Sequence, residues 1–464
     1  MGTAVGQVPS SHPAARCLAA LLVYAALLGC DADPVVAPMP RLDPRPVSAS
    51  PVLAPATGTT SQGAPAGTTL RTAALERLLG SGPLGASPGA LVVDAATGQT
   101  LLDHDAAVPR TPASVLKLAT GAAALTTLDP GSRLTTRVVT GTVDSEVILV
   151  GAGDTTLTRG PDPLAYPRRA GLRELADATA TALRTQGQTS VTLAVDDSLF
   201  AGPPVSPDWP PTYVTSGVVS PVSALSLDGG RLDPQSDTRA SDPALEAGRS
   251  FADLLARRGV TVTGEIGRSV APVNGGDDLA AVESPTVVEL VELMLGSSDN
   301  DLAESLLRLV AAAAGRPATF SDGTAVVAGV LAELGVPTDG LVLLDGSGLA
   351  RGSAVAPATL AALLVLAAGD GSDPELDHLV SGLPVAGFSG TLSGRYRAGR
   401  PRTAAGLVRA KTGTLNGVST LAGVTTAGPH PVVFVVMADQ VPGDTLAAQA
   451  VLDRFAATLA RPAP

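Results

Sequence analysis

The sequence contains very little cysteine and histidine, and neither residue type is placed for chemistry. Both cysteines, Cys17 and Cys30, lie close to the start of the 464-residue chain. A cysteine nucleophile or a thiolate metal site in the rest of the chain is therefore excluded. The four histidines stand far apart, at positions 12, 104, 378 and 430. They show no zinc-ligand spacing and weaken any histidine-based triad, so we expect no metal and no cofactor.

Aromatic residues are also scarce, at 2% of the chain, and no block of basic residues offsets a net charge of −12. Few aromatics leave no platform for base stacking, and an acidic surface does not attract nucleic acid. We therefore expect no nucleic-acid partner. Charged residues make up 16% and hydrophobic residues 45%. This balance predicts a folded chain that is long enough to bury a substantial core.

Lysine is the third scarce residue. Of 31 basic residues, only Lys117 and Lys411 are lysines, and the others are arginines. Arginine stays protonated, whereas a lysine can lose its proton and act as a base. Two lysines left by chance in an arginine-biased composition are the alternative. Their surroundings in the sequence have to decide between these two interpretations.

The N-terminal part predicts export. Residues 17–29 form a continuous apolar run after Arg16, too short for a comfortable membrane span and typical of a signal peptide. The run ends in Leu27-Leu28-Gly29-Cys30, which resembles a bacterial lipoprotein cleavage box and makes Cys30 a candidate for lipidation. An ordinary signal peptide or an uncleaved anchor within residues 1–30 is the alternative. Residues 31–69, rich in proline, alanine and threonine, predict an extended linker. We expect an exported protein of the cell envelope that contacts a membrane only through its N-terminal segment.

From residue 70 onward, helical and strand patterns alternate. Helical patterns cover residues 70–79, 114–128, 171–185, 251–258, 286–310 and 444–459. Strand patterns include a hairpin at 90–93 and 100–103, short strands between about 135 and 275, and three consecutive antiparallel strands at 407–412, 418–425 and 432–438. Helices at both chain ends around an antiparallel sheet predict an α+β or layered α/β body.

The first motif with catalytic potential is Ser114-Val115-Leu116-Lys117. Residues i and i+3 lie on one face of a helix, so the hydroxyl and the amine can meet. Serine is a weak nucleophile until a nearby base takes its proton, and a desolvated lysine can be that base. At a helix start, free backbone N–H groups also favour a developing negative charge. Taken alone, the motif is equally compatible with a helix-capping serine and a surface lysine.

Two further motifs follow in order along the chain. Ser298-Asp299-Asn300 combines a hydroxyl that can relay a proton with an amide that can bind a peptide backbone, although a simple helix cap is the alternative. Lys411-Thr412-Gly413-Thr414 ends a predicted strand and offers a cation and a hydroxyl for a carboxylate. Gly413 lets a substrate backbone lie against the strand, and the alternative is an ordinary strand end. Each motif is weak alone, but the two lysines of the chain occupy two of the three.

Together the three motifs are typical of class A β-lactamases and penicillin-binding proteins. The chain further resembles the D-alanyl-D-alanine carboxypeptidase/endopeptidase family, the S13 peptidases, over about residues 70–460. The stretches that carry this resemblance are 150–154, 195–200, 345–349, 383–387, 390–392 and 410–417.

The resemblance implies a penicillin-binding-protein-like transpeptidase domain in which an antiparallel sheet is flanked by helices. It also implies that this domain is split into residues 70–135 and 277–464 by an inserted, mainly β region at 136–276. The implied activity is that of a serine-type D-Ala-D-Ala carboxypeptidase acting on peptidoglycan stem peptides, with β-lactams as inhibitors. The balance between carboxypeptidase and D,D-endopeptidase activity stays open.

The roles implied by the resemblance are specific. Ser114 is the nucleophile, Lys117 its base, and Ser298 the relay to the leaving amine. Asn300 holds the acyl-side amide, and Lys411 and Thr412 bind the terminal carboxylate. Gly413 lies along the substrate backbone, and the N–H groups of Ser114 and Thr414 form the oxyanion hole.

Four further residues attract attention without receiving a catalytic role. We interpret Asp154, Asp345 and Arg351 as parts of structural turns and ion pairs. Glu304 stands four residues after Asn300 on the same predicted helix, and no role in deacylation is assigned to it. Two rival functions remain: a serine β-lactamase or esterase on the same scaffold, and a non-catalytic cell-wall binding protein.

Overall fold

The computed structural model describes residues 66–160, 165–272, 277–369, 373–425 and 430–460. Within these residues, the first sheet has five strands in the order β2-β1-β11-β10-β9, and every neighbouring pair is antiparallel. The predicted hairpin is confirmed as β1 and β2, and the three predicted C-terminal strands are confirmed as β9 to β11. The strands are β1 Gly89–Asp94, β2 Thr100–His104, β9 Val408–Leu415, β10 Val418–Thr425 and β11 Val432–Ala438.

Both faces of this sheet are covered, so its central strand is apolar throughout. On β11, Phe434 and Val436 pack into a cluster with the terminal helices α1 (Ala66–Leu79) and α11 (Thr445–Leu459). Val433 and Val435 pack into the larger cluster on the opposite face, which holds α9 (Pro357–Ala368). The alternation follows from the two-residue period of a strand.

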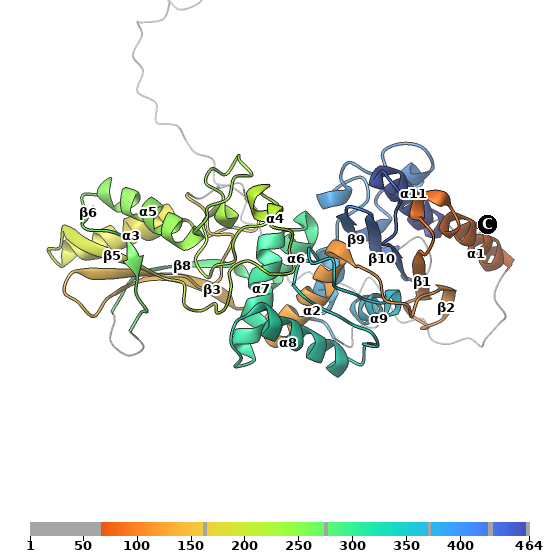
Figure 1. Ribbon diagram of the computed structural model, residues 1–464, viewed down its shortest axis with the longest axis horizontal. Helices are drawn as coiled ribbons and strands as arrows, with labels where there is room; N and C mark the ends of the chain where they lie inside the picture. Colours follow the sequence, from red (N-terminus) through yellow and green to blue (C-terminus); the bar gives the residue numbers. More distant parts are fainter. Residues whose placement is uncertain (1–65, 161–164, 273–276, 370–372, 426–429, 461–464) are drawn as a thin grey trace, which may run out of the picture. The chain divides into compact units, whose positions relative to one another are not determined.

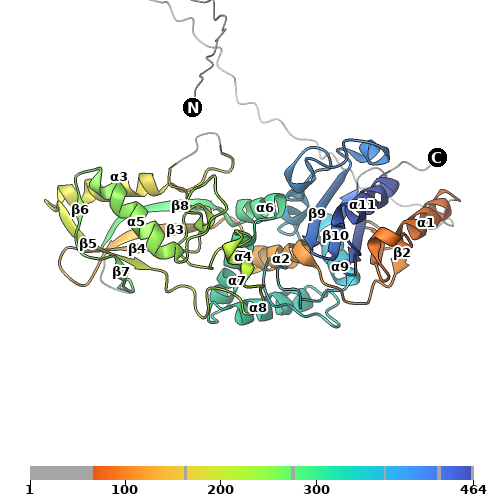
Figure 2. The same cartoon turned by 45° about the horizontal axis from the view of Figure 1, so that its top comes forward.

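The larger cluster is built mainly from helices (Figure 2). At its centre, α2 (Lys117–Thr127) is buried from Lys117 to Leu125 and packs against α6, α7, α8 and α9. A short 3-10 turn, η2 (Ala113–Leu116), leads into it. The other helices of this part are α6 Val287–Ser297, α7 Asn300–Ala313, α8 Phe320–Glu333 and α10 Asp377–Ser381.

A second sheet of six strands lies between α2 and α6 in the chain. Its path is β6-β5-β4-β3-β8, with β7 also pairing with β5. The first and last strands, β3 and β8, are antiparallel neighbours with Arg133 opposite Thr286, so the chain leaves and returns at the same place. The strands are β3 Arg133–Thr140, β4 Glu146–Val150, β5 Ser190–Asp196, β6 Thr261–Val262, β7 Gly267–Arg268 and β8 Asp278–Thr286.

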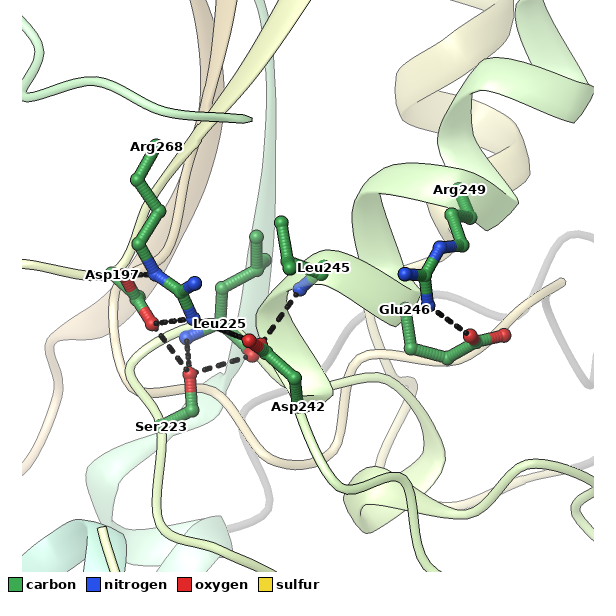
Figure 3. A network of polar contacts seen from close by, with 8 residues as sticks. All are labelled: Asp197, Ser223, Leu225, Asp242, Leu245, Glu246, Arg249 and Arg268. Carbon is green, nitrogen blue, oxygen red and sulfur yellow. Dashed lines mark hydrogen bonds and ion pairs between the residues drawn. The ribbon is translucent and has the colours of Figure 1, made fainter. Parts of the chain in front are cut away.

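Two amphipathic helices, α3 (Leu172–Thr185) and α5 (Pro243–Ala256), pack side by side on this second sheet (Figure 1). The single turn α4 (Thr212–Thr215) belongs to the same stretch of chain. Arg268 ties the sheet to α5 by donating hydrogen bonds to Asp197 and to Asp242, whose carboxylate caps the N-terminus of α5 (Figure 3).

The predicted helical stretch at 286–310 is two helices, not one. Ser298 has a left-handed backbone (φ 61°) and ends α6, and Asp299 then caps α7 by accepting a hydrogen bond from the Leu302 N–H. Periodicity alone did not detect this break because both helices bury apolar residues in the same cluster.

The predicted leader, the linker and Cys30 lie outside the described residues. Among the helices that the structure does describe, none is long and apolar enough to cross a membrane.

Candidate active site

Ser114 and Lys117 meet as their spacing predicts. Ser114 lies in η2, and Lys117 begins α2 and is completely buried. The Lys117 Nζ donates to Ser114 Oγ at 3.1 Å, to Asn300 Oδ1 at 2.8 Å and to the Ser347 carbonyl oxygen at 2.9 Å. These partners come from three separate parts of the chain and fix the direction of the amine toward the hydroxyl.

Burial changes the chemistry of this amine. It lowers the pKa of Lys117 from its ordinary value of 10.5 to about 8, although the nearby Glu304 and Asp345 carboxylates act in the opposite direction. Desolvation destabilises the ammonium more than it destabilises the neutral amine. Near neutral pH, the neutral fraction of Lys117 is therefore minor but far larger than that of a lysine with the ordinary pKa, which makes the amine usable as a base.

Ser298 and Asn300 lie on opposite sides of the Asp299 cap. Ser298 Oγ accepts a hydrogen bond from Lys411 Nζ at 2.7 Å. Asn300 accepts from Lys117 through Oδ1 and donates through Nδ2 to the Val218 carbonyl at 2.9 Å. Within this motif, Ser298 therefore contacts Lys411 and Asn300 contacts Lys117.

Lys411 is the second completely buried lysine. Besides Ser298, its Nζ donates to the Thr412 carbonyl oxygen at 2.9 Å. Burial, reinforced by the positive charge of Lys117, lowers the pKa of Lys411 well below its usual range. A bound carboxylate opposite this amine would favour its charged form again.

Strand β9 packs directly against the segment that carries Ser114. A Cβ atom on Gly413 would lie 2.8 Å from the Pro112 carbonyl oxygen and 3.0 Å from the Ser114 nitrogen, so only glycine fits there. Thr420 on β10 donates to the same Pro112 carbonyl at 2.8 Å. The two neighbours of Gly413 on β9 are more accessible than Gly413. The Thr412 hydroxyl donates to the Thr391 hydroxyl at 2.9 Å, and Thr414 Oγ1 accepts from the Gln449 side-chain amide at 3.3 Å. The structure thus brings all eight predicted site residues to one place.

Sequence reasoning missed the loop that supports Lys117. The Glu304 carboxylate, completely buried, accepts hydrogen bonds from the N–H groups of Gly346 and Ser347 at 2.9 and 2.8 Å. Asp345 accepts from the Trp209 indole at 2.8 Å and from the Gly348 N–H at 2.9 Å. Two signals were available: the Asp-Gly-Ser-Gly turn, and the position of Glu304 one helical turn after Asn300.

Asp154 and Asp345, interpreted as parts of turns and ion pairs, accept hydrogen bonds within local turns, whereas Arg351 contacts a distant backbone carbonyl. Asp154 accepts from the N–H and hydroxyl of Thr156, and Arg351 donates to the Asn416 carbonyl oxygen at 2.7 Å. Within the described residues, neither these two nor Asp345 takes part in an ion pair. The same part of the chain contains no cluster of three or more His, Cys, Asp or Glu side chains suited to a metal ion.

Comparison with known families agrees with this geometry. A model of the D-Ala-D-Ala carboxypeptidase 3 (S13) family matches residues 71–241 and 235–459. The chain belongs to the S13 family. The predicted family and the predicted class of enzyme, a serine-type D-Ala-D-Ala carboxypeptidase, are thereby confirmed.

Two mycobacterial relatives match most of this S13 chain. It is 39% identical over 341 residues to "Carboxypeptidase DacB" of Mycolicibacterium smegmatis, covering 72% of each protein. It is 37% identical over 394 residues to "Carboxypeptidase Rv3627c" of Mycobacterium tuberculosis, covering 83% of this chain and 82% of the relative.

The crystal structure of penicillin binding protein 4 (dacB) from Haemophilus influenzae has the same fold. The TM-score is 0.68 at 24% sequence identity, covering 83% of this chain and 98% of that protein. The predicted fold class, a penicillin-binding-protein-like domain with an antiparallel sheet flanked by helices, is confirmed.

Proposed function

We propose that this S13 enzyme is an exported serine D-Ala-D-Ala carboxypeptidase that acts on peptidoglycan stem peptides through an acyl-enzyme. The observation that carries the proposal is the completely buried Lys117, whose Nζ lies 3.1 Å from Ser114 Oγ. Both mycobacterial relatives are named as carboxypeptidases, which supports the reaction type.

In the first step, neutral Lys117 takes the proton of the Ser114 hydroxyl as Oγ attacks the carbonyl carbon of the penultimate D-alanine. We assign the oxyanion hole to the backbone N–H groups of Ser114 and Thr414. Each such donor contributes typically about 3–4 kcal/mol of transition-state stabilisation. The close contact of Gly413 with the Ser114 backbone supports this assignment because it sets β9 directly beside the nucleophile.

Collapse of the tetrahedral intermediate breaks the C–N bond, and the leaving amine needs a proton. Ser298 is our candidate for the relay, supported by its hydrogen bond to Lys411. Lys411 and Thr412 bind the terminal carboxylate of the leaving D-alanine, and the arriving carboxylate raises the lowered pKa of Lys411. Asn300 binds the acyl-side amide. Water then hydrolyses the acyl-enzyme and regenerates Ser114.

The rival β-lactamase function needs a dedicated base for rapid deacylation. Glu304, the carboxylate considered for that role, is completely buried and accepts backbone hydrogen bonds on both oxygens. It is therefore engaged in structure rather than free to activate water. This favours a slowly released β-lactam adduct. The intact contacts among Ser114, Lys117 and Asn300 equally disfavour a non-catalytic binding protein.

Labelling with a fluorescent penicillin tests the proposal. We expect one stable adduct on the wild-type protein, located at Ser114 by mass spectrometry, and none on Ser114→Ala. A label that disappears within seconds would identify a β-lactamase, and no label at all would identify a binding protein. An adduct that persists on Ser114→Ala would contradict the assigned nucleophile.

The domain organisation and location are part of the same proposal. Residues 70–135 and 277–464 form the catalytic domain, and 136–276 are inserted material. The pairing of β3 with β8 supports an insertion because both ends of the inserted segment lie together.

Export through the segment before residue 31 would bring the enzyme to the cell envelope. If Cys30 is lipidated, the wild-type protein should partition into the detergent phase, and Cys30→Ala should stay in the aqueous phase or remain unprocessed. Equal partitioning of the wild-type protein and the variant would mean an ordinary signal peptide or a protein anchor.

A further inference from the structure

The turn at residues 345–350 touches both the proposed base and the segment that carries the nucleophile. Its Ser347 carbonyl oxygen accepts from Lys117 Nζ at 2.9 Å. Gly348, with a left-handed backbone (φ 82°), packs against the carbonyl group of Ala113, and a Cβ atom there would collide with that oxygen. Because Ala113 directly precedes the nucleophile, a displacement of this turn changes the position of the amine relative to the hydroxyl.

Two buried carboxylates hold the turn in place. From α7, the Glu304 carboxylate accepts hydrogen bonds from two of its N–H groups. Asp345, at the start of the turn and 1% exposed, accepts from the N–H groups of Gly348 at 2.9 Å and Ala350 at 2.6 Å. The Asp345 carboxylate therefore closes the turn from within, so whatever positions this carboxylate also positions the turn.

The indole of Trp209 anchors the Asp345 carboxylate. Its Nε1–H donates to Asp345 Oδ2 at 2.8 Å, and only 4% of Trp209 is exposed. The ring itself is held by an edge-to-face contact with Phe320 at the start of α8, with 5.3 Å between the ring centroids. An indole has one donor and no acceptor, so it can only support an acceptor at this place. Trp209 lies in the proposed inserted region, 136 residues before Asp345.

The chain that follows Trp209 is also fastened to the site. The Val218 carbonyl oxygen accepts from Asn300 Nδ2 at 2.9 Å. The Ser220 N–H donates to the buried Asp301 carboxylate at 2.6 Å. Both partners lie in the first turn of α7. This stretch of the inserted region is therefore held against the candidate active site at three points, which gives the indole a fixed base from which to support the turn.

We propose that Trp209 is a positioning residue for the acylation step. Through Asp345 it holds the 345–350 turn, and through that turn it holds the Lys117 amine in line with the Ser114 hydroxyl. This inference rests on the proposed roles of Lys117 and Ser114. Trp209 acts through Asp345 and not on the reacting groups themselves, so it affects the rate by preventing small displacements that slow catalysis. The inserted region thus contributes to the chemical step.

Removal of one N–H group tests the proposal without changing the shape of the core. Trp209 is the only tryptophan of the chain, so biosynthetic replacement of tryptophan by benzothienylalanine alters this position alone. The analogue has a sulfur atom in place of the indole N–H and cannot donate. We expect kcat on a D-Ala-D-Ala pentapeptide to fall about 10-fold, within the range for a hydrogen bond to a charged group. KM should change less than about twofold, because no substrate contact is lost. Trp209→Phe, which also lacks the donor, should show the same division between kcat and KM.

A second substitution shows whether the effect passes through Asp345. In an Asp345→Asn background the carboxylate is already lost, so the analogue should lower kcat by less than about a further twofold. Thr179→Val on α3 is the matched control, because it removes another buried hydrogen bond of the inserted region, from Thr179 Oγ1 to the Leu175 carbonyl oxygen at 2.8 Å. This control should leave kcat and KM unchanged, and circular dichroism should show that all these proteins are folded.

The two lysines provide a readout that does not depend on activity. In protein labelled with ¹³C at lysine Cε, Lys117 and Lys411 give the two lysine signals of the chain, and Lys117→Arg assigns them. Loss of the indole donor should move the Lys117 signal more than the Lys411 signal, because the Ser347 carbonyl moves with the turn. Thr179→Val should move neither signal.

An unmoved Lys117 signal, or an unchanged kcat in an enzyme that hydrolyses the pentapeptide, would overturn the inference. Losses that simply add in the Asp345→Asn background would overturn it as well. A wild-type protein that neither hydrolyses the pentapeptide nor reacts with penicillin would instead refute the proposed function, and the lysine signals would still decide whether Trp209 positions Lys117.

Discussion

Glu304 and Lys117 both hydrogen-bond the backbone of Ser347, Glu304 at its N–H group and Lys117 at its carbonyl oxygen. The Glu304 carboxylate accepts from the Ser347 N–H at 2.8 Å, and the Ser347 carbonyl oxygen accepts from Lys117 Nζ at 2.9 Å. All three groups are inaccessible to solvent. The carboxylate therefore positions the loop that orients the amine without contacting Ser114.

From this arrangement we expect Glu304→Gln to lower the acylation rate about 100-fold, as small displacements of reacting groups do. The glutamine side chain has one oxygen and one NH₂ group, so its NH₂ would face a backbone N–H that now donates to a carboxylate oxygen. The loop would move to relieve this contact, and the Ser347 carbonyl would shift with it. The loss should lie in kcat more than in KM. Burial raises the pKa of Glu304 itself to about 8, and its charged form raises the pKa of Lys117. Removing that charge should therefore move the rising part of the pH–rate profile to lower pH.

Glu333→Gln, at an exposed position near the end of α8, is the matched control for loss of one glutamate charge. A Glu304→Gln enzyme with the wild-type pH profile and a normal acylation rate would contradict the positioning role.

The two lysines should respond differently to arginine. Lys117→Arg retains the charge but cannot supply a base, so acylation should fall at least by the ~10²–10⁴ that general-base catalysis contributes. Lys411→Arg still offers a cation to a carboxylate, so we expect measurable activity with much of the loss in substrate binding. Both sites are fully buried, so circular dichroism should accompany the rates. A Lys117→Arg enzyme as active as wild type, or more active than Lys411→Arg, would refute the assigned roles.

The pH dependence of acylation should report Lys117. A base acts when it is deprotonated, and burial lowers the pKa of Lys117 to about 8. The rate of penicillin acylation by the free enzyme should therefore rise with pH and level off above about 8. Stopped-flow acylation between about pH 5 and about pH 10 measures this, because that interval brackets the pKa of Lys117. A rate that is flat across this interval would exclude Lys117 as the base.

Chelation should leave catalysis unchanged, because the proposed mechanism uses hydroxyl, amine and amide groups and no metal ion. Hydrolysis of a D-Ala-D-Ala peptide after prolonged treatment with a strong chelator measures this. Activity that is lost and then returns with zinc would overturn the serine mechanism.

Asp242 offers a test of stability separate from catalysis. Its carboxylate accepts from the Leu245 N–H at 3.1 Å at the start of α5 and from Arg268 at 2.8 Å. Asp242→Ala should lower the free energy of unfolding by about 1 kcal/mol, the usual value of an N-cap, with kcat unchanged. Asp242→Asn keeps the cap and should lose less, because the partly exposed ion pair contributes little. Denaturant unfolding distinguishes the two, and equal losses would assign the effect to the ion pair.

Short-range features were predictable from the sequence. The hairpin, the three C-terminal strands and the meeting of Ser114 with Lys117 depend on periods of two or about 3.6 residues, which the chain displays directly. The scarcity of lysine drew attention to Lys117 and Lys411 before any geometry was known. The break at Ser298 was missed because it depends on one left-handed residue between two apolar helices.

Tertiary structure alone decided how the amine is held and how its acidity is set. Ser347 reaches Lys117 only because Glu304, distant in sequence, accepts the N–H groups of that loop. The lowered pKa of Lys117 likewise comes from burial beneath several helices, a quantity that no local pattern contains. Local sequence indicates which groups can react, because residue type and helical spacing are local properties. The packing of distant segments determined their direction, partners and protonation, because desolvation and hydrogen-bond geometry depend on everything that surrounds a side chain.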